Sequence, residues 1–241
     1  MTMQWLDLSF PDPAWNLACD EALLEILEEG YPNEILRFWE SPSPFVVLGY
    51  SNQISTEANI SYCQSRQIPI LRRCSGGGTV LQGLGCLNYS VILRIPEDGP
   101  LSSARGTNRF VMSRLRDALQ PWLPDPVEIQ GYTDLTLGNR KFSGNSQRRK
   151  RKSLLFHGTF LLDMDIRLIH QALHLPNIKP DYRQNRSHSE FLIHLPLPAA
   201  QVKKALKSHW VALNPMNQVP MAKIEDLVAQ KYSQSRWNEK F

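Results

Sequence analysis

The sequence has little cysteine and no long apolar run, and both shortages limit what the chain can be. Its four cysteines are Cys19, Cys63, Cys74 and Cys86, all in the first third of the chain, and none forms a CxxC pair. This arrangement argues against a zinc site. No apolar stretch approaches the ~18 residues of a membrane-spanning helix, so we expect no membrane partner. The N-terminal segment lacks the basic and apolar regions of a signal peptide, which favours a cytoplasmic protein with reduced thiols.

Composition and charge describe a globular chain with one strongly basic stretch. Of its 241 residues, 42% are hydrophobic and 21% are charged, which suits a soluble protein with a sizeable core. The net charge is only +4, yet residues 148–152 place five cations in a row. Such a run is usually a solvated loop, but it also suits an acidic protein partner, a phosphate or a nucleic acid. No nucleic-acid-binding motif accompanies it, so we expect no nucleic-acid partner.

Helical and extended patterns follow one another without a regular βαβ rhythm. Helices are predicted at 11–29, 57–66, 105–120, 163–174, 198–209 and 222–232, and in the first of them acidic residues occupy the polar positions. Extended segments are predicted at 34–40, 45–50, 69–73, 87–95 and 133–138, and residues 177–191 read as a polar loop. This order favours an α+β fold. We expect a single domain over 1–241, with 198–241 a helical C-terminal extension and no separate accessory domain.

The most informative segment is RRCSGGGTV at residues 72–80, in which three glycines follow two arginines, a cysteine and a serine. Glycine tolerates positive φ and lets the main chain approach a ligand closely. Arginine offers a planar set of donors for carboxylate or phosphate. The segment therefore indicates a loop that folds over an anionic small molecule, although glycine runs by themselves are more often simple turns.

A second segment, residues 134–162, contains Lys141 and the triplet His157-Gly158-Thr159. A compact cation after a short strand suits a phosphate or a developing oxyanion, or it is simply a solvated lysine at a strand end. A histidine taken alone is more often a hydrogen-bonded core residue. The presence of both segments in one chain favours the functional interpretation of each.

Three ordered stretches resemble the lipoate–protein ligase and octanoyltransferase family, whose catalytic domain is related to that of biotin–protein ligase. They are NLACDEALLE with LRFWESPSPFVVLGYSNQ, then RRCSGGGTV with GCLNYSVIL, then DLTLGNRKFSGNSQ with LLFHGTFLL. The resemblance covers most of residues 5–165. It implies a mixed, mostly antiparallel sheet flanked by helices. It also implies an enzyme that joins a medium-chain acid, lipoic or octanoic, to a lysine of a carrier domain.

The resemblance also implies roles for individual residues. Lys141 is expected to contact the acyl carbonyl and the α-phosphate of an acyl-adenylate, where a fixed cation and backbone N–H groups stabilise charge in a site closed to water. The residues expected to bind the acyl group and nucleotide are Arg72, Ser75, Gly76, Gly77, Gly78, Val80, Asn88, Asp134, Gly144, Ser146, His157, Gly158 and Thr159. No residue is identified as the base that deprotonates the carrier lysine.

Ligands and partners follow from the same resemblance. The cofactor is lipoate or lipoyl-AMP, with ATP and magnesium if the enzyme activates the free acid. The partners are lipoyl carrier domains, of dehydrogenase E2 subunits or the glycine-cleavage H protein, with acyl carrier protein or a separate accessory chain as further candidates. Because such carrier domains are typically acidic, Arg148, Arg149 and Arg151 are predicted to guide carrier docking.

The chain departs from the family pattern in three ways. Bacterial ligases that activate free lipoate usually carry an extra C-terminal domain, so this chain is expected to be the catalytic half of a split ligase, a transferase that uses a ready-made acyl-adenylate, or a compact self-sufficient enzyme. Gln82-Gly83 stands where the family often has His-Asp, and Cys86 stands where it has asparagine. Dedicated octanoyltransferases carry the acyl group on a cysteine after the His-Gly strand or before the lysine segment, and this chain has none at either place. Cys74 and Cys86 are candidate replacements, with Arg72 and its neighbour favouring the Cys74 thiolate, or both are small packed side chains.

Three functions remain open from the sequence. The preferred one is transfer of a lipoyl or octanoyl group to a carrier lysine through an acyl-adenylate. The second is cysteine-dependent octanoyl transfer from acyl carrier protein, and the third is a non-catalytic module that binds lipoyl carriers or nucleotide. Lipoate and octanoate present similar apolar chains, so the sequence does not choose between them.

Overall fold

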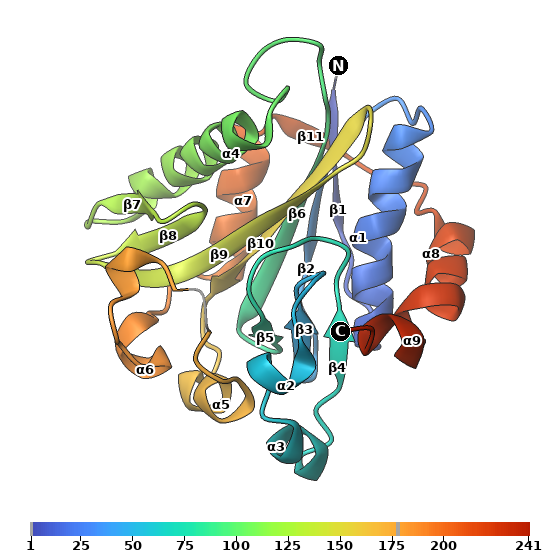
Figure 1. Ribbon diagram of the computed structural model, residues 1–241. Helices are drawn as coiled ribbons and strands as arrows, with labels where there is room; N and C mark the ends of the chain where they lie inside the picture. The colour runs from blue at the N-terminus through green and yellow to red at the C-terminus, as the bar shows by residue number, and fades with distance from the viewer. Residues whose placement is uncertain (1, 177–178) are drawn as a thin grey trace.

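The computed structural model describes residues 2–176 and 179–241, which form two sheets and the helices around them (Figure 1). The large sheet has eight strands in the order β11, β1, β2, β6, β10, β9, β8, β7. Their bounds are Met3–Asp7 (β1), Glu34–Trp39 (β2), Cys86–Arg94 (β6), Val127–Gln130 (β7), Asp134–Leu137 (β8), Arg140–Arg149 (β9), Ser153–Leu161 (β10) and Ala212–Pro215 (β11). β1 runs parallel to β2 and β11, and the pairs from β2 through β7 are antiparallel. The predicted α+β class and mixed, mostly antiparallel sheet are confirmed.

The small sheet holds both ends of the glycine-rich segment. Its order is β4 (Ile70–Arg72), β3 (Phe45–Leu48) and β5 (Val80–Gln82), with β3 parallel to β4 and antiparallel to β5. Residues 73–79 connect β4 to β5 and are called the glycine loop below. Because β3 pairs with the strands on either side of it, both ends of this loop are fixed.

Helices lie on both faces of the large sheet and around the small sheet. They are α1 (Pro13–Glu28), α2 (Ile54–Glu57), α3 (Ile60–Ser65), α4 (Ala104–Leu119), α5 (Ile166–Ala172), α6 (His188–Phe191), α7 (Ala199–His209), α8 (Met221–Leu227) and α9 (Ser235–Asn238). α4 and α7 pack on one face with the aromatic residues of β6, β9 and β10, whereas α1 and the small sheet cover the other (Figure 1). α1 begins where the Asp12 carboxylate accepts a hydrogen bond from the backbone N–H of Ala14 (2.8 Å) and Pro13 occupies the first turn.

The structure also corrects several local predictions. The helix expected at 57–66 is two short helices, α2 and α3, and strands β1, β5, β7, β9 and β11 were not predicted. The basic run belongs to β9 as far as Arg149, so only its last three residues form a turn. The segment 198–241 is largely helical, but β11 joins it to the large sheet beside β1.

The predicted polar loop 177–191 begins with Asn177 and Ile178, which lie outside the described residues, and its remainder contains a 3-10 turn and α6. None of the described helices is both long enough and apolar enough to span a bilayer.

Candidate active site

Arg73 organises the glycine loop from inside. Its buried guanidinium donates from Nε to Ser75 Oγ (3.0 Å) and from Nη2 to the carbonyls of Gly78 (2.8 Å) and Gly76. Burial lowers the pKa of Arg73 to about 10, so the side chain still carries its charge at neutral pH. The sequence suggested Arg73 only as a neighbour that favours the Cys74 thiolate, not as a residue that organises the loop.

Arg72 is placed differently from the prediction. Its guanidinium is fully buried and donates to the carbonyls of Gly49 (2.9 Å) and Asn52 (2.8 Å) and to that of Asn238 in the C-terminal segment (3.0 Å). Arg72 therefore links the C-terminal segment to residues 49–52, and its guanidinium does not point toward the ligand side of the glycine loop. Successive residues on a strand point to opposite faces, so only one of two adjacent arginines can face the ligand. The sequence does not show which of the two that is.

The three glycines are not equivalent. Gly77 has a φ of +88°, and a Cβ added there would lie 2.9 Å from Arg73 Nη2 and 3.3 Å from the Ser146 Cβ. At Gly76 and Gly78 an added Cβ would meet open space, and neither residue has a positive φ. The conformation of the loop therefore requires glycine at 77, where the main chain lies against Arg73 and Ser146.

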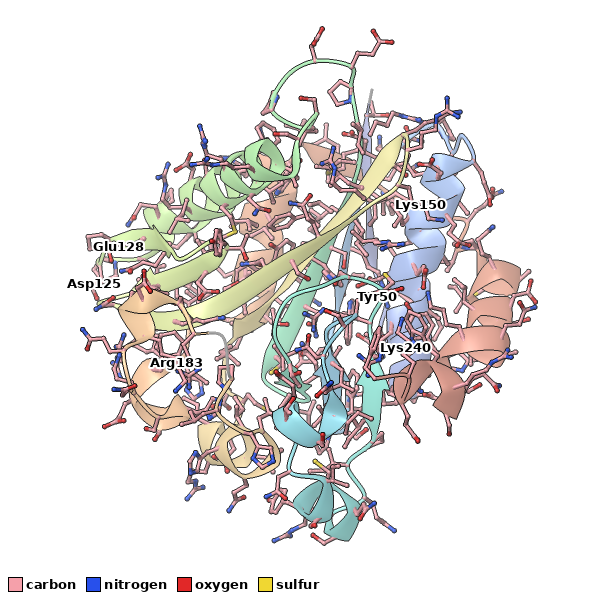
Figure 2. The ribbon with its side chains drawn as sticks, in the orientation of Figure 1. Tyr50, Asp125, Glu128, Lys150, Arg183 and Lys240 are labelled. Carbon is pink, nitrogen blue, oxygen red and sulfur yellow. The ribbon has the colours of Figure 1, made fainter. Side chains whose placement is uncertain are left out.

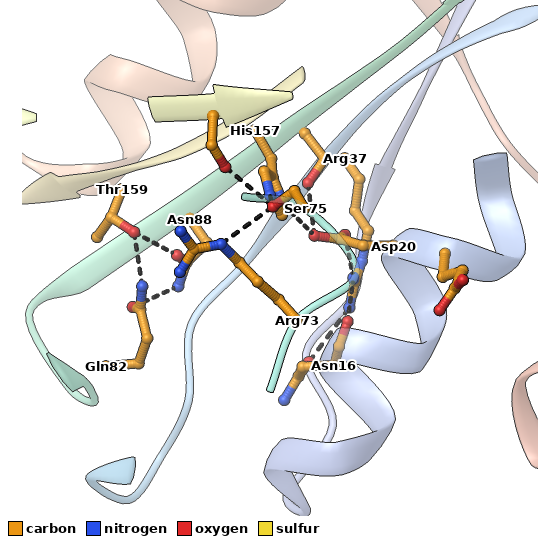
Figure 3. Close-up of polar contacts among 12 residues, drawn as sticks. Asn16, Asp20, Arg37, Arg73, Ser75, Gln82, Asn88, His157 and Thr159 are labelled. Atoms are coloured by element: carbon orange, nitrogen blue, oxygen red, sulfur yellow. Dashed lines mark hydrogen bonds and ion pairs between the residues drawn. The ribbon is translucent and has the colours of Figure 1, made fainter. Parts of the chain in front are cut away.

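A chain of polar side chains runs beneath the glycine loop (Figure 3). Ser75 Oγ lies 2.9 Å from Ser146 Oγ on β9 and 2.6 Å from His157 Nε2 on β10. His157 Nδ1 lies 3.2 Å from Asp20 Oδ2 on α1. Four segments far apart in the sequence thus meet in one hydrogen-bonded line, of which the sequence analysis named Ser75, Ser146 and His157 but not Asp20.

Asp20 is a buried anion held by three partners. Its Oδ1 pairs with Arg37 Nη1 at 2.5 Å, and its Oδ2 accepts hydrogen bonds from Ser90 (2.8 Å) and His157. Burial by itself raises the pKa of this carboxyl, but the Arg37 charge and the hydrogen bonds from His157 and Ser90 outweigh it and hold the pKa below its ordinary value. Asp20 is therefore ionised and acts only as an acceptor.

Three further polar side chains form a closed ring of hydrogen bonds beside this line. Gln82 donates to Thr159 Oγ1 (2.6 Å), Thr159 donates to Asn88 Oδ1 (2.6 Å), and Asn88 donates back to Gln82 Oε1 (2.9 Å) (Figure 3). The three side chains come from β5, β10 and β6. The predicted residues Asn88 and Thr159 are thus brought together, and Gln82, noted from the sequence as a departure, completes their ring.

Lys141 lies at the start of β9 and forms an ion pair with Asp134 on β8. The Lys141 Nζ to Asp134 Oδ1 distance is 2.8 Å, and the hydroxyl of Tyr182 donates to Asp134 Oδ2 at 2.7 Å. A Cβ added at Gly144 would lie 2.7 Å from Lys141 Nζ, so the amine sits directly over that glycine. The Lys141 side chain is 26% exposed, so the amine is accessible to a ligand.

Gly144 also relates Lys141 to the polar chain. Gly144 and Ser146 are two residues apart on one strand and share a face, which separates them by about 7 Å. Lys141 and the Ser146 hydroxyl therefore flank the same short stretch of β9.

Two other predicted residues have structural surroundings. A Cβ at Gly158 would lie 1.7 Å from Asn145 Oδ1, so this glycine makes room for the half-buried Asn145 side chain. Val80 is half-buried and packs with the α1 core.

The basic run divides between the two faces of β9. Arg148 is exposed with its guanidinium 5.8 Å from the centre of the Tyr50 ring, and Arg151 is exposed in the turn. Arg149 points the other way and donates to Thr107 Oγ1 (2.9 Å) and the Leu101 carbonyl (2.8 Å) beside α4. Arg149 therefore anchors β9 to α4, and only Arg148 and Arg151 of the predicted docking set lie free at the surface.

Tyr50 also carries a second cation, which extends the basic surface to the end of the chain. Lys240 Nζ lies 3.5 Å from the centre of the Tyr50 ring, and the two residues are adjacent in Figure 2. The backbone N–H of Tyr50 donates to the Ser75 carbonyl (2.8 Å), so this cationic surface borders the glycine loop.

The two candidate thiols are buried and protonated. Cys74 is 4% exposed and Cys86 0%, and burial, with nearby carboxylates as a smaller cause, raises the pKa of each to about 12. The expectation that neighbouring arginines favour the Cys74 thiolate is wrong, because desolvation outweighs any nearby positive charge. The alternative, that both are packed side chains, agrees with their burial.

The amino-acid sequence matches the model of the lipoyl protein ligase A/B catalytic domain over residues 12–210. The chain belongs to this family. Among its relatives, the octanoyltransferase LipM of Halalkalibacterium halodurans is 25% identical, with 98% of each chain covered. LipM of Moorella thermoacetica is 31% identical over 73% of this chain and 71% of the relative. Lipoate–protein ligase 1 of Staphylococcus aureus is 28% identical over 94% of this chain and 70% of the relative.

Solved structures agree on the fold of this family member. A bipartite lipoate protein ligase from Thermoplasma acidophilum superposes with a TM-score of 0.85 and 23% identity, covering 99% of this chain and 96% of the other. Lipoate–protein ligase A bound with ATP superposes with a TM-score of 0.82 and 22% identity, covering 99% of each chain. The fold is thus that of the biotin/lipoate ligase catalytic domain, and the chain is an enzyme of the lipoate ligase and octanoyltransferase family.

Proposed function

We propose that this enzyme transfers a lipoyl or octanoyl group from an acyl-adenylate to a lysine of a lipoyl carrier domain. The observation that carries the proposal is the position of Lys141, a partly exposed amine that Asp134 holds over Gly144. An amine over Gly144, which lies about 7 Å along β9 from Ser146, suits an anion bound under the glycine loop. The proposed acyl donor supplies both a phosphate and a carbonyl on which negative charge develops.

The residues around Lys141 match the needs of that donor. Gly77 and Gly78 are exposed and offer backbone N–H groups to a phosphate, while Arg73 keeps the loop in shape from below. Lys141 stabilises the oxyanion that forms when the carrier amine attacks the acyl carbonyl. The bond from the carbonyl carbon to the phosphate oxygen then breaks, and AMP leaves as an anion.

ATP and magnesium belong to the proposal only if the enzyme also makes the acyl-adenylate. Over residues 2–176 and 179–241, no group of three or more His, Cys, Asp or Glu side chains is arranged to hold a metal ion. The cationic residues at the glycine loop do suit nucleotide phosphates, and magnesium commonly binds through such phosphates with few protein ligands. When bound, ATP would supply the adenylyl group that activates the free acid.

The proposed partner is an acidic lipoyl carrier domain, which would dock over Arg148, Arg151 and Lys240. Arg148 and Lys240 lie against Tyr50, which borders the glycine loop, and Arg151 lies farther along the hairpin in the β9–β10 turn. The lipoylation system of Thermoplasma acidophilum pairs its bipartite ligase with an E2 lipoyl domain, which supports a carrier of this kind. The four free cysteines fit a reducing cytoplasm, where such carriers would be met.

A second candidate, octanoyl transfer from acyl carrier protein, draws support from the relatives named octanoyltransferase LipM. The buried, protonated Cys74 and Cys86 do not favour a thioester on either thiol. Octanoyl transfer by this chain would therefore need direct attack of the carrier amine on the donor thioester.

One experiment separates these alternatives. The purified enzyme and an apo lipoyl domain are incubated with lipoyl-AMP, with lipoate plus ATP and magnesium, or with octanoyl acyl carrier protein, and the carrier is weighed by intact-mass spectrometry. We expect acylation from lipoyl-AMP. Acylation from octanoyl acyl carrier protein alone would replace the proposal by the second candidate, and no acylation from any donor would contradict both.

A further inference from the structure

The chain of side chains from Ser146 to Asp20 connects the partly exposed surface of β9 to a buried anion. Ser146 is partly exposed, His157 has a side chain that is 12% exposed, and Ser75 and Asp20 are buried. The successive distances are 2.9, 2.6 and 3.2 Å, all within hydrogen-bonding range. Such a line is a route along which a proton can move.

The donors and acceptors fix its direction. Ionised Asp20 has no proton to give, so His157 Nδ1 carries a hydrogen and Nε2 is an acceptor. Ser75 must then donate its hydroxyl hydrogen to His157 Nε2.

The remaining contacts of Ser75 complete the order. Its oxygen accepts a hydrogen bond from Arg73 Nε (3.0 Å), which leaves one lone pair for the Ser146 hydroxyl. Ser146 therefore donates to Ser75, and the lone pairs of Ser146 Oγ remain free to accept from a ligand.

We propose that Ser146, Ser75 and His157 relay a proton from the amine of the carrier lysine toward Asp20. The inference rests on the proposed function, because the amine must attack an acyl carbonyl held at Lys141. Gly144, under the Lys141 amine, lies about 7 Å along β9 from Ser146, so the attacking nitrogen would lie between Lys141 and Ser146. As the amine nitrogen bonds to the acyl carbon, it gives a proton to Ser146 Oγ, Ser146 gives its own to Ser75, and Ser75 gives its own to His157 Nε2. His157 becomes an imidazolium beside the Asp20 carboxylate, AMP leaves, and the extra proton later returns to solvent.

Burial distinguishes this role from nucleophilic catalysis by Ser75. A serine, histidine and aspartate in this order resemble a hydrolase triad, in which the serine oxygen attacks the substrate. Here Ser75 is a residue of the glycine loop and is 0% exposed, so its oxygen is out of reach of an acyl carbon. The positive charge of Arg73 beside Ser75 instead stabilises its oxygen while the proton passes.

The main test compares Ser146→Ala with Ser143→Ala. Ser143 is also on β9 but bonds to Asn145 on the opposite face, so its loss controls for removal of a strand hydroxyl. Transfer from lipoyl-AMP to the apo lipoyl domain is measured under single turnover, together with the Kd of a sulfamoyl analogue of lipoyl-AMP. For Ser146→Ala we expect a roughly 100-fold slower rate, with KM for carrier and Kd within about twofold of wild type.

A rise in Kd that matches the loss of rate would overturn the relay, because it would make Ser146 a phosphate ligand. An unchanged rate would overturn it as well. If the wild-type enzyme transfers no acyl group from any donor, the proposed function itself fails, which is a different result from an active wild type with an equally active Ser146→Ala variant.

A second comparison tests whether the residues act as a unit. The variants Ser146→Ala and His157→Gln, and the double variant, are compared after their folding is checked by thermal melting. A relay predicts that the double variant is no slower than the slower single variant, since either change breaks the route. Multiplied defects in the double variant would show independent roles and contradict the relay.

Discussion

Gly144→Ala offers a way to displace Lys141 without touching it. An added Cβ would lie 2.7 Å from Lys141 Nζ and 2.8 Å from its Cε, well inside the ordinary contact distance of at least 3.4 Å. The amine must therefore move by more than about 0.5 Å, away from its 2.8 Å ion pair with Asp134. A displacement of about 1 Å at a reacting centre can cost about 100-fold in rate.

The same change should leave folding nearly intact, because the atoms that must move are the end of a flexible side chain. A partly exposed ion pair contributes only about 0–1 kcal/mol, so we expect a small change in the free energy of unfolding. The assay is single-turnover transfer from lipoyl-AMP to the apo lipoyl domain, followed by intact mass. Equilibrium denaturation of the same samples measures stability.

The Lys141→Ala background supplies the control for this prediction. If Gly144→Ala acts by moving Lys141, it should slow the Lys141→Ala enzyme by less than about twofold further. A full 100-fold additional loss in that background, or a wild-type rate for Gly144→Ala alone, would refute the reasoning.

Three further predictions concern the C-terminal segment, the basic surface and the thiols. Asn238→Ala removes the acceptor for the backbone N–H of a buried arginine and should cost about 1–3 kcal/mol in the free energy of unfolding, measured by urea denaturation. Arg148→Ala with Arg151→Ala should raise KM for the carrier severalfold at low salt but leave KM for the small acyl donor unchanged, and equal effects on both would argue against docking. Cys74 and Cys86 should resist a thiol reagent in the folded enzyme at about pH 8, and the double change to alanine should retain transfer. Because folding raises both pKa values from 9.0 to about 12, the stability due to their neutral forms is present below about pH 9 and is lost as the pH rises toward 12.

Two of these predictions have matched controls in the chain. Glu239 is exposed next to Asn238, so Glu239→Ala should change the free energy of unfolding by less than about 0.5 kcal/mol. Arg149→Ala should lower stability by breaking its hydrogen bonds beside α4, with little effect on KM for the carrier. Rapid acylation or alkylation of Cys74 in the folded protein would contradict the account of the thiols.

The elements with strong local signals were predictable from the sequence. The helix predicted at 11–29 and the extended segment predicted at 87–95 appear close to their predicted positions, as α1 and β6. Strands β1 and β11 were missed because they are only five and four residues long and pair in parallel with each other, between segments about 200 residues apart. Such strands are defined by tertiary partners more than by their own residues.

Most residues of the candidate site could be predicted from sequence motifs, but their hydrogen-bond and ion-pair partners could not. Ser75, Ser146 and His157 were named from the motifs, but Asp20 counted only among the acidic residues at the polar positions of the helix predicted at 11–29. It is instead buried because Arg37, on β2, neutralises it, and no local pattern reveals that pairing. Arg72 was predicted at the loop where the structure has Arg73, and the cause is similar. The direction of the Arg72 side chain depends on its contact with the C-terminal segment, which no local pattern reveals.

The most direct test of the central claim is single-turnover transfer from lipoyl-AMP to an apo lipoyl domain by the wild-type and Lys141→Ala enzymes. If Lys141 stabilises the reacting carbonyl and phosphate, the wild type should acylate the carrier stoichiometrically. The variant should be at least about 100-fold slower while keeping a wild-type melting temperature. Transfer by Lys141→Ala at the wild-type rate would contradict the account.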